Sequence, residues 1–174
     1  MGWNAGGFGI MSFPDAGALQ AWQAAVVSHA DWDDWIQELR FGLTETFCVR
    51  DRLAFFAEMH DPRSYNMYLI AIDGNHVELV FDAGEDGFRE DAGDIAALLR
   101  SASRYGAVGR FYFLGTAGAE GDFVYQLDLD DRASTLTELS DPMDIDAVYG
   151  GHEYQAFFAR LLDMLEAGNP AISR

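Results

Sequence analysis

The strongest constraint on the fold comes from a pair of apolar segments joined by Asp73-Gly74. Residues 65–72 are rich in strand-forming side chains and are apolar on both faces. Residues 76–81 alternate between apolar and polar side chains. Asp-Gly is a strong signal for a tight turn between two antiparallel strands. Together these segments predict a β-hairpin.

The same periodicities predict further strands and helices. Strands are expected at residues 7–13, 110–114, 122–130 and 135–139. Helices are expected from Asp15 through Val26, over 31–41, from Asp91 or Asp94 to Gly106, and over 151–167. Because most strands follow one another in hairpins, this order predicts an α+β fold. A mainly antiparallel sheet of hairpins would pack with about three to four helices in a single globular domain over residues 1–174.

Residues 47–59 fit two periodicities. Val49, Leu53 and Phe56 share one face of a helix, whereas residues 53–59 alternate as in a strand. Because a turn signal at 61–64 leads into the predicted hairpin, we predict a strand for the second half of this segment.

Acidic residues dominate the charged side chains. The chain has 29 acidic and 11 basic residues, a formal net charge of −18, and every basic residue is an arginine. Hydrophobic residues make up 49% of the sequence, which is too apolar for a disordered acidic tail. The charge is therefore expected on the surface of a folded body, where arginines such as Arg52 pair with surface acids. Such a surface disfavours nucleic acids and anionic membranes as partners and favours a basic protein.

Two stretches, 82–94 and 120–146, contain the densest acidic residues. From the first we select Asp82, Glu85, Asp86, Glu90 and Asp91 as candidate partner-binding residues. From the second we select Asp128, Asp130, Asp131, Asp144 and Asp146, with Tyr149 as an aromatic anchor. Acidic patches of this kind steer association with a positively charged cleft.

The lack of lysine excludes several classes of catalytic site. A P-loop, a Schiff-base enzyme and a kinase all need a lysine. The chain also has no HExxH, CxxC or GxSxG motif. Its histidines are scattered, and its aspartate runs lack the glycine and the distal glutamate of a calcium loop. We therefore expect no enzymatic activity, no catalytic residue, no metal site and no cofactor.

Cys48 is the single cysteine of the sequence. No intrachain disulfide can form, which favours a reducing, cytoplasmic location. Residues 1–6 have neither a basic region nor an apolar run, so we expect no signal peptide. No stretch is long and apolar enough to predict a transmembrane helix.

The profile of the chain resembles the small, acidic, cytosolic immunity proteins of bacterial polymorphic and secreted toxin systems. The shared features are length, charge, a single α+β domain of hairpins and the lack of a catalytic motif. The start GFGIMSFPDAGALQAW, a glycine-rich strand followed by a capped helix with Trp22, also resembles such proteins. This resemblance implies a protein that neutralises a cognate, basic toxin by covering its active site. It carries over no functional residues and no oligomeric state.

Two alternatives compete with this hypothesis. The first is a carboxylate- or metal-dependent hydrolase, because two carboxylates with a water or metal suffice for hydrolysis. The second is a generic acidic structural domain from a salt-adapted or GC-rich organism, since acid surplus and lysine loss are typical of both.

Overall fold

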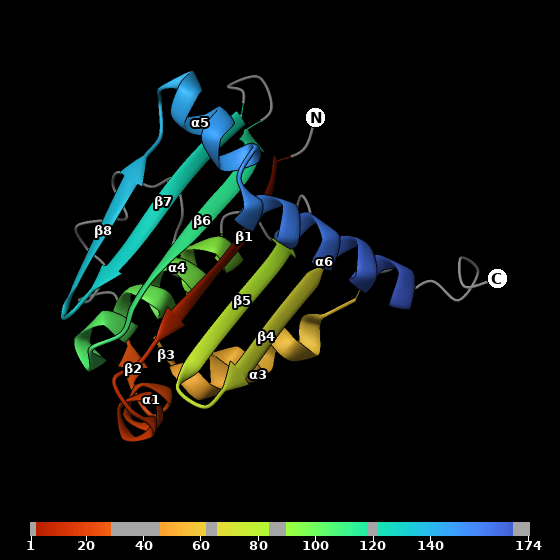
Figure 1. Ribbon diagram of the computed structural model, residues 1–174. Helices are drawn as coiled ribbons and strands as arrows, with labels where there is room; N and C mark the ends of the chain where they lie inside the picture. The colour runs from red at the N-terminus through yellow and green to blue at the C-terminus, as the bar shows by residue number, and fades with distance from the viewer. Residues whose placement is uncertain (1–2, 29–45, 62–65, 84–89, 118–121, 169–174) are drawn as a thin grey trace.

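The fold is built on a six-stranded antiparallel sheet with the strand order β4-β5-β1-β6-β7-β8 (Figure 1). It is seen in a computed structural model that describes residues 3–28, 46–61, 66–83, 90–117 and 122–168. The strands are β1 (Trp3–Ser12), β4 (Met67–Asp73), β5 (His76–Ala83), β6 (Val108–Ala117), β7 (Asp122–Asp130) and β8 (Ala133–Glu138). A separate two-stranded ladder joins β2 (Val26–Val27) to β3 (Phe47–Cys48).

The glycines of β1 allow this strand to lie at the centre of the sheet, between β5 and β6. A Cβ atom at Gly7 would collide with the Phe81 ring of β5. A Cβ atom at Gly9 would collide with the Phe111 ring of β6. Both aromatic rings therefore lie across the backbone of β1, and only glycine leaves room for them.

Tight turns connect two pairs of neighbouring strands. β4 and β5 pair from Asp73↔His76 onwards, and Gly74 in the turn between them has φ = 60°, a value that favours glycine. β7 and β8 pair in the same way across a short turn that contains Arg132, whose φ is 67°. The hairpin predicted around Asp73-Gly74 is thus confirmed.

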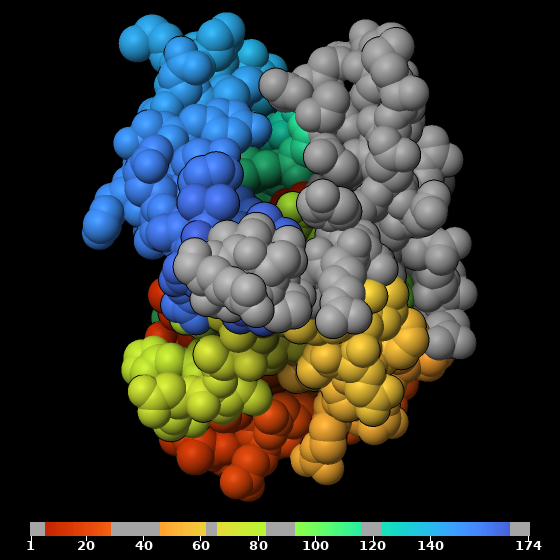
Figure 2. All heavy atoms as spheres, turned by 90° about the vertical axis from the view of Figure 1, so that its right-hand side faces the viewer, coloured from red at the N-terminus to blue at the C-terminus, as the bar shows by residue number. Residues whose placement is uncertain are grey.

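Helices cover both faces of the sheet. On one face lie α1 (Ala16–Gln23), α3 (Val49–Met59) and α4 (Glu90–Ala102), with a 3-10 turn at Ser103–Tyr105. On the other lie α5 (Pro142–Tyr149) and α6 (His152–Gly168). Figure 2 shows the layers from the side, with the blue atoms of α5 and α6 opposite the orange atoms of α3. None of the helices described here is long and apolar enough to span a bilayer.

The larger core lies between the sheet and α1, α3 and α4. Trp22 of α1 is fully buried there, and its indole nitrogen donates to the Ser101 hydroxyl of α4 at 3.0 Å. Asp15 caps α1 by accepting a hydrogen bond from the Ala18 amide at 2.8 Å, as the sequence predicted.

The smaller core lies under α6. Phe157 of α6 stacks on Phe8 of β1, with ring centroids 4.7 Å apart. Leu161 of α6 and the sheet residues Met67, Val80, Leu114 and Val124 complete its buried part. α6 runs across one part of the sheet, over β1, β5 and β4, and leaves other parts of this face open (Figure 1).

A buried ion pair joins α3 to α4. Nη1 of Arg52 lies 3.1 Å from Oδ2 of Asp94, and the Asp94 side chain is only 1% exposed. The Arg52 guanidinium also lies over the Phe47 ring, 4.7 Å from its centroid. The prediction that Arg52 pairs on the surface is therefore wrong. Asp94 is a buried partner inside α4 and does not cap this helix.

The α+β class and the mainly antiparallel sheet are confirmed, and two local predictions are corrected. The second half of residues 47–59 belongs to α3 and forms no strand, because Val49, Leu53 and Phe56 bury one helical face. α5 was not predicted: Asp141 accepts from the Met143 amide at 2.8 Å and Pro142 begins the helix. The helix predicted over 31–41 lies outside the described residues.

Candidate functional site

The exposed acids of the second stretch lie near the two ends of the edge strand β8. Asp130 ends β7 and Asp131 lies in the β7–β8 turn, whereas Asp144 and Asp146 lie on α5, beyond the other end of β8. All four side chains are exposed. β8 has 6 residues and so separates the two groups by about 20 Å. The structure thus brings these acids to one edge of the sheet, in two groups (Figure 1).

Two further exposed acids lie between these groups, and the sequence prediction did not select them. Glu138 ends β8, and Asp141 precedes α5 as its N-cap. We call the whole set the acidic edge. It consists of Asp130, Asp131, Glu138, Asp141, Asp144 and Asp146. Both additional residues lie in the dense acidic stretch, so the density itself was the signal.

Ion pairing neutralises little of the acidic edge. Among the described residues, its ion pair is Asp131 Oδ1 with Arg132 Nε at 3.9 Å, and both side chains are largely exposed. An exposed pair of this kind contributes little to stability and leaves the local field negative. The acidic edge therefore presents an excess of negative charge to an approaching partner.

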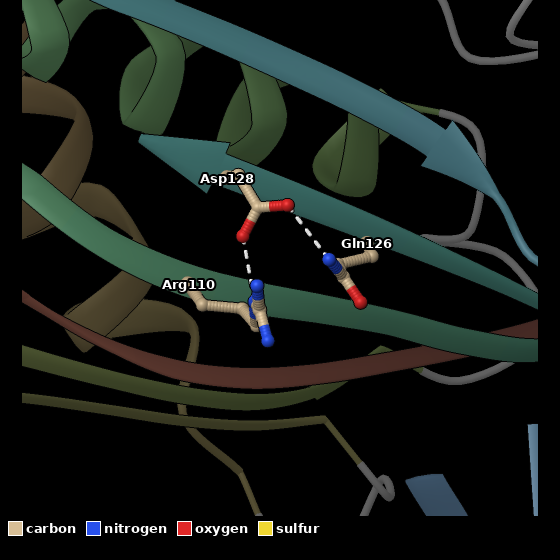
Figure 3. Close-up of polar contacts among 3 residues, drawn as sticks. All are labelled: Arg110, Gln126 and Asp128. Carbon is tan, nitrogen blue, oxygen red and sulfur yellow. Dashed lines mark hydrogen bonds and ion pairs between the residues drawn. The ribbon is translucent and has the colours of Figure 1, made fainter. Parts of the chain in front are cut away.

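Asp128 differs from the other selected acids because arginine neutralises it. It lies on β7 opposite Arg110 of β6, and Arg110 Nε donates to its Oδ1 at 2.6 Å (Figure 3). Gln126 Nε2 donates to the other carboxylate oxygen at 2.7 Å. The hydrogen bond to Asp128 raises the pKa of the Arg110 guanidinium above its ordinary value. Asp128 is therefore a fixed ion-pair partner, and we place it beside the acidic edge.

The acids of the first stretch do not join the acidic edge. Asp82 lies on β5, half-buried on the α6 face of the sheet, and three strands lie between β5 and β8. Burial raises the pKa of the Asp82 carboxyl above its ordinary value. Glu85 and Asp86 lie outside the described residues. Glu90 and Asp91 begin α4, and their side chains also lie outside the description.

Tyr149 anchors α5 to α6. Its ring meets the Tyr154 ring edge-on, with centroids 4.9 Å apart. It is half-buried in the smaller core, together with Ile145 and Val148 of α5. This contact within the protein accounts for the position of Tyr149 and supplies no evidence that it meets a partner.

A groove opens beside α6, on the part of the sheet that this helix leaves uncovered. Its volume is about 490 Å³. Phe8, Ile10 and Val80 of the sheet and Phe157 of α6 line its apolar part. Its polar lining comes from Glu78 and Arg110 of the sheet and from His152, Glu153 and Arg160 of α6.

Metal-ligating residues are dispersed in the described part of the chain. No group of three or more histidine, cysteine, aspartate or glutamate side chains is placed there to hold a metal ion. Cys48 is half-buried, and its thiol donates a weak hydrogen bond to the Gln23 carbonyl at 3.6 Å. The acidic edge and the groove are therefore the two surface features of the described residues that could bind a partner.

Comparison with known proteins adds no family to this description. No family model, no curated protein and no solved structure matches the chain. The function proposed below therefore depends on where this chain places its own side chains.

Proposed function

We propose that this protein is an immunity protein, which binds a basic protein toxin and neutralises it by covering the toxin's active site. The supporting observation is the acidic edge, whose carboxylates are exposed while the described residues bring a single arginine, Arg132, into ion-pair distance of it. A net charge of −18 adds a long-range field of the same sign. Complementary charge accelerates encounter and selects a basic partner over an acidic one.

The first experiment is a neutralisation assay in the native host. The tagged protein is used to capture its partner, and the captured protein is expressed alone and together with this chain. We expect a basic protein that stops growth when expressed alone and permits growth in the presence of this chain. A partner that is acidic, or that is harmless when expressed alone, contradicts the proposal.

Charge reversal then tests the acidic edge. The edge variant carries Asp130→Lys, Asp131→Lys, Asp144→Lys and Asp146→Lys. Because it replaces attraction with repulsion, we expect neutralisation to fail at expression levels that suffice for the wild type. The growth assay with the captured toxin measures this difference.

A matched control separates local from total charge. The acids Asp51 and Glu58 are exposed on α3, on the opposite face of the sheet. Their reversal is compared with the reversal of Asp130 and Asp131 alone, since both double variants change the net charge equally. Equal loss of neutralisation in the two double variants would show that the edge itself has no role.

The hydrolase alternative has a direct test of its own. The unfolding temperature is measured with Mg²⁺, Mn²⁺, Ca²⁺ and Zn²⁺ in turn. A protein that binds none of them in the folded state is not stabilised by them. We expect no metal-dependent rise, and a saturable rise with one ion would favour the hydrolase.

A further inference from the structure

The groove beside α6 is unusual because it exposes apolar side chains from the middle of the sheet. Phe8 of the central strand β1 is buried under Phe157. Ile10, two residues further along the same face, is 55% exposed. Val108 of β6, at the same end of the sheet, is 45% exposed. Along β1, α6 thus covers Phe8 but not Ile10, which lies about 7 Å further along the strand.

The helix side of the groove includes two small residues. Ala156 and Ala159 of α6 contribute to its wall beside the larger Phe157 and Arg160, and their small side chains leave space next to Ile10. The volume of about 490 Å³ is sufficient for a large aliphatic or aromatic side chain. Buried anchor side chains of this type supply much of the affinity of protein interfaces.

Ion pairs fix the charged side chains around the groove. Arg160 of α6 lies 3.0 Å from Glu78 of β5, measured from Nη1 to Oε1, and Arg110 binds Asp128. Glu153 at the start of α6 lines the groove with an exposed carboxylate, and Asp130, two residues after Asp128 at the end of β7, is also exposed. The local charge is therefore negative, because both arginines have acidic partners and two further acids lie nearby.

The groove is continuous with the acidic edge. Arg110 lines the groove and binds Asp128, and Asp130 follows Asp128 by two residues on the same face of β7. A partner held by Asp130 and Asp131 would thus reach the groove with a neighbouring part of its surface.

We propose that the groove receives an apolar side chain, flanked by lysine or arginine, from the same basic protein partner. This inference depends on the proposed function and names the second contact of its interface. The apolar side chain would cover the exposed Ile10, while the flanking cations would meet Glu153 and Asp130.

A short peptide serves as the probe, because it tests the groove without the toxin. The protein is labelled at its isoleucine methyl groups and titrated with N-acetyl-Lys-Trp-Lys amide. We expect a saturable shift of the Ile10 methyl signal, with a Kd of about 1 mM. N-acetyl-Lys-Gly-Lys amide lacks the apolar side chain and so tests its contribution to binding. N-acetyl-Glu-Trp-Glu amide keeps the tryptophan and reverses the charge of the flanking residues. We expect each of these to bind at least about fivefold more weakly.

A pair of variants tests the location. Ala156→Trp fills the groove and is expected to abolish the Ile10 shift. Ala57→Trp adds the same side chain to an exposed position of α3, on the opposite face, and should leave the shift unchanged. The inference is overturned if Ile10 shows no saturable shift, if Ala156→Trp leaves the shift intact, or if the acidic peptide binds as well as the basic one.

The two proposals fail in different ways. If the groove inference alone is wrong, Ala156→Trp still neutralises the captured toxin and the edge variant does not. If the immunity function is wrong, no captured partner is toxic, whatever the peptide does.

Discussion

Single residues show that acids in this chain have different roles in stability. Asp94 and Asp82 belong to the same acidic stretch, yet Asp94 binds a buried arginine and Asp82 lies half-buried on the α6 face. Asp130 and Asp131 are exposed. Total charge therefore says little about what an individual carboxylate does, and burial decides it.

The Asp94–Arg52 pair gives a prediction for stability. Asp94→Ala leaves the Arg52 guanidinium buried without this partner, so we expect the free energy of unfolding to fall by about 3–5 kcal/mol. Denaturant unfolding measures the change. The double variant Arg52→Met/Asp94→Leu removes both charges and should recover most of the loss. As a control, Asp131→Ala should change stability by less than about 0.5 kcal/mol.

Asp82 gives a prediction for pH dependence. Burial raises its folded-state pKa above the ordinary value of 3.8, so ionisation is less favourable in the folded state than in the unfolded chain. The resulting loss of stability is absent below pH 3.8, grows as the pH rises, and is complete above the folded-state pKa. Asp82→Asn should therefore stabilise the protein at pH 7 but not below pH 3.8. Unfolding curves across this pH range measure the difference, and an equal effect at both ends would contradict it.

At the scale of elements, the central strand β1 depends on its glycines. Gly9→Ala places a Cβ atom against the Arg110 carbonyl and the Phe111 ring, so we expect a loss of at least about 2 kcal/mol. A Cβ atom at Gly74 meets no atom within 4 Å, so Gly74→Ala is unfavourable only because of the positive φ at this position. We expect this variant to lower the free energy of unfolding by about 1 kcal/mol. Denaturant unfolding measures the loss of stability in the two variants, which should be larger for Gly9→Ala. A larger loss for Gly74→Ala would show that β1 can shift to make room for the added Cβ atom.

The two aspartate caps give a contrast between helices. Asp15 caps α1, which buries Trp22, whereas Asp141 caps α5, which has no fully buried residue. Asp15→Ala should lower global stability by about 1 kcal/mol. Asp141→Ala should instead accelerate amide exchange within α5 and change global unfolding little. Hydrogen exchange and thermal melting together distinguish the two, and a large global effect of Asp141→Ala would be unexpected.

These elements also show what the sequence could and could not predict. The strands of the sheet were predicted because alternation and turn residues are local signals. α3 was mistaken for a strand in part because residues 53–59 alternate by chance, and only packing shows that Phe55 is 43% exposed. α5 was missed because Asp-Pro after a strand is typical of a break, although an aspartate N-cap followed by proline, as at Asp141-Pro142, also begins helices.

The candidate site, like the fold, could be predicted from the sequence only in part. The exposure of Asp130 and Asp131 follows from strand alternation and a turn. The neutralisation of Asp128 does not, because it depends on the register of β6 against β7, which pairs it with Arg110. The groove was also unpredictable, since it arises where α6 stops covering three strands that are distant in sequence.

On the scale of the whole molecule, the net charge predicts a response to salt. Repulsion among acids opposes the compact state, and salt screens it. Raising NaCl from about 20 mM to about 500 mM should stabilise the protein by about 1 kcal/mol, which corresponds to about 2–4 °C in Tm. Thermal melting measures this rise. A protein that is unfolded at the lower salt concentration would favour the salt-adapted alternative over an acidic surface used for binding.

The most direct test of the central claim is the association rate with the captured basic partner, measured against salt for the edge variant and for the α3 reversal. The acidic edge should accelerate association, so reversal of its four aspartates should lower the rate constant at low salt by about tenfold or more. The wild type and the α3 reversal should both lose rate as salt rises, and the edge variant, whose net charge is still negative, should lose less. Wild-type association that is insensitive to salt, or an edge variant that associates as fast as the α3 reversal, would contradict the proposal.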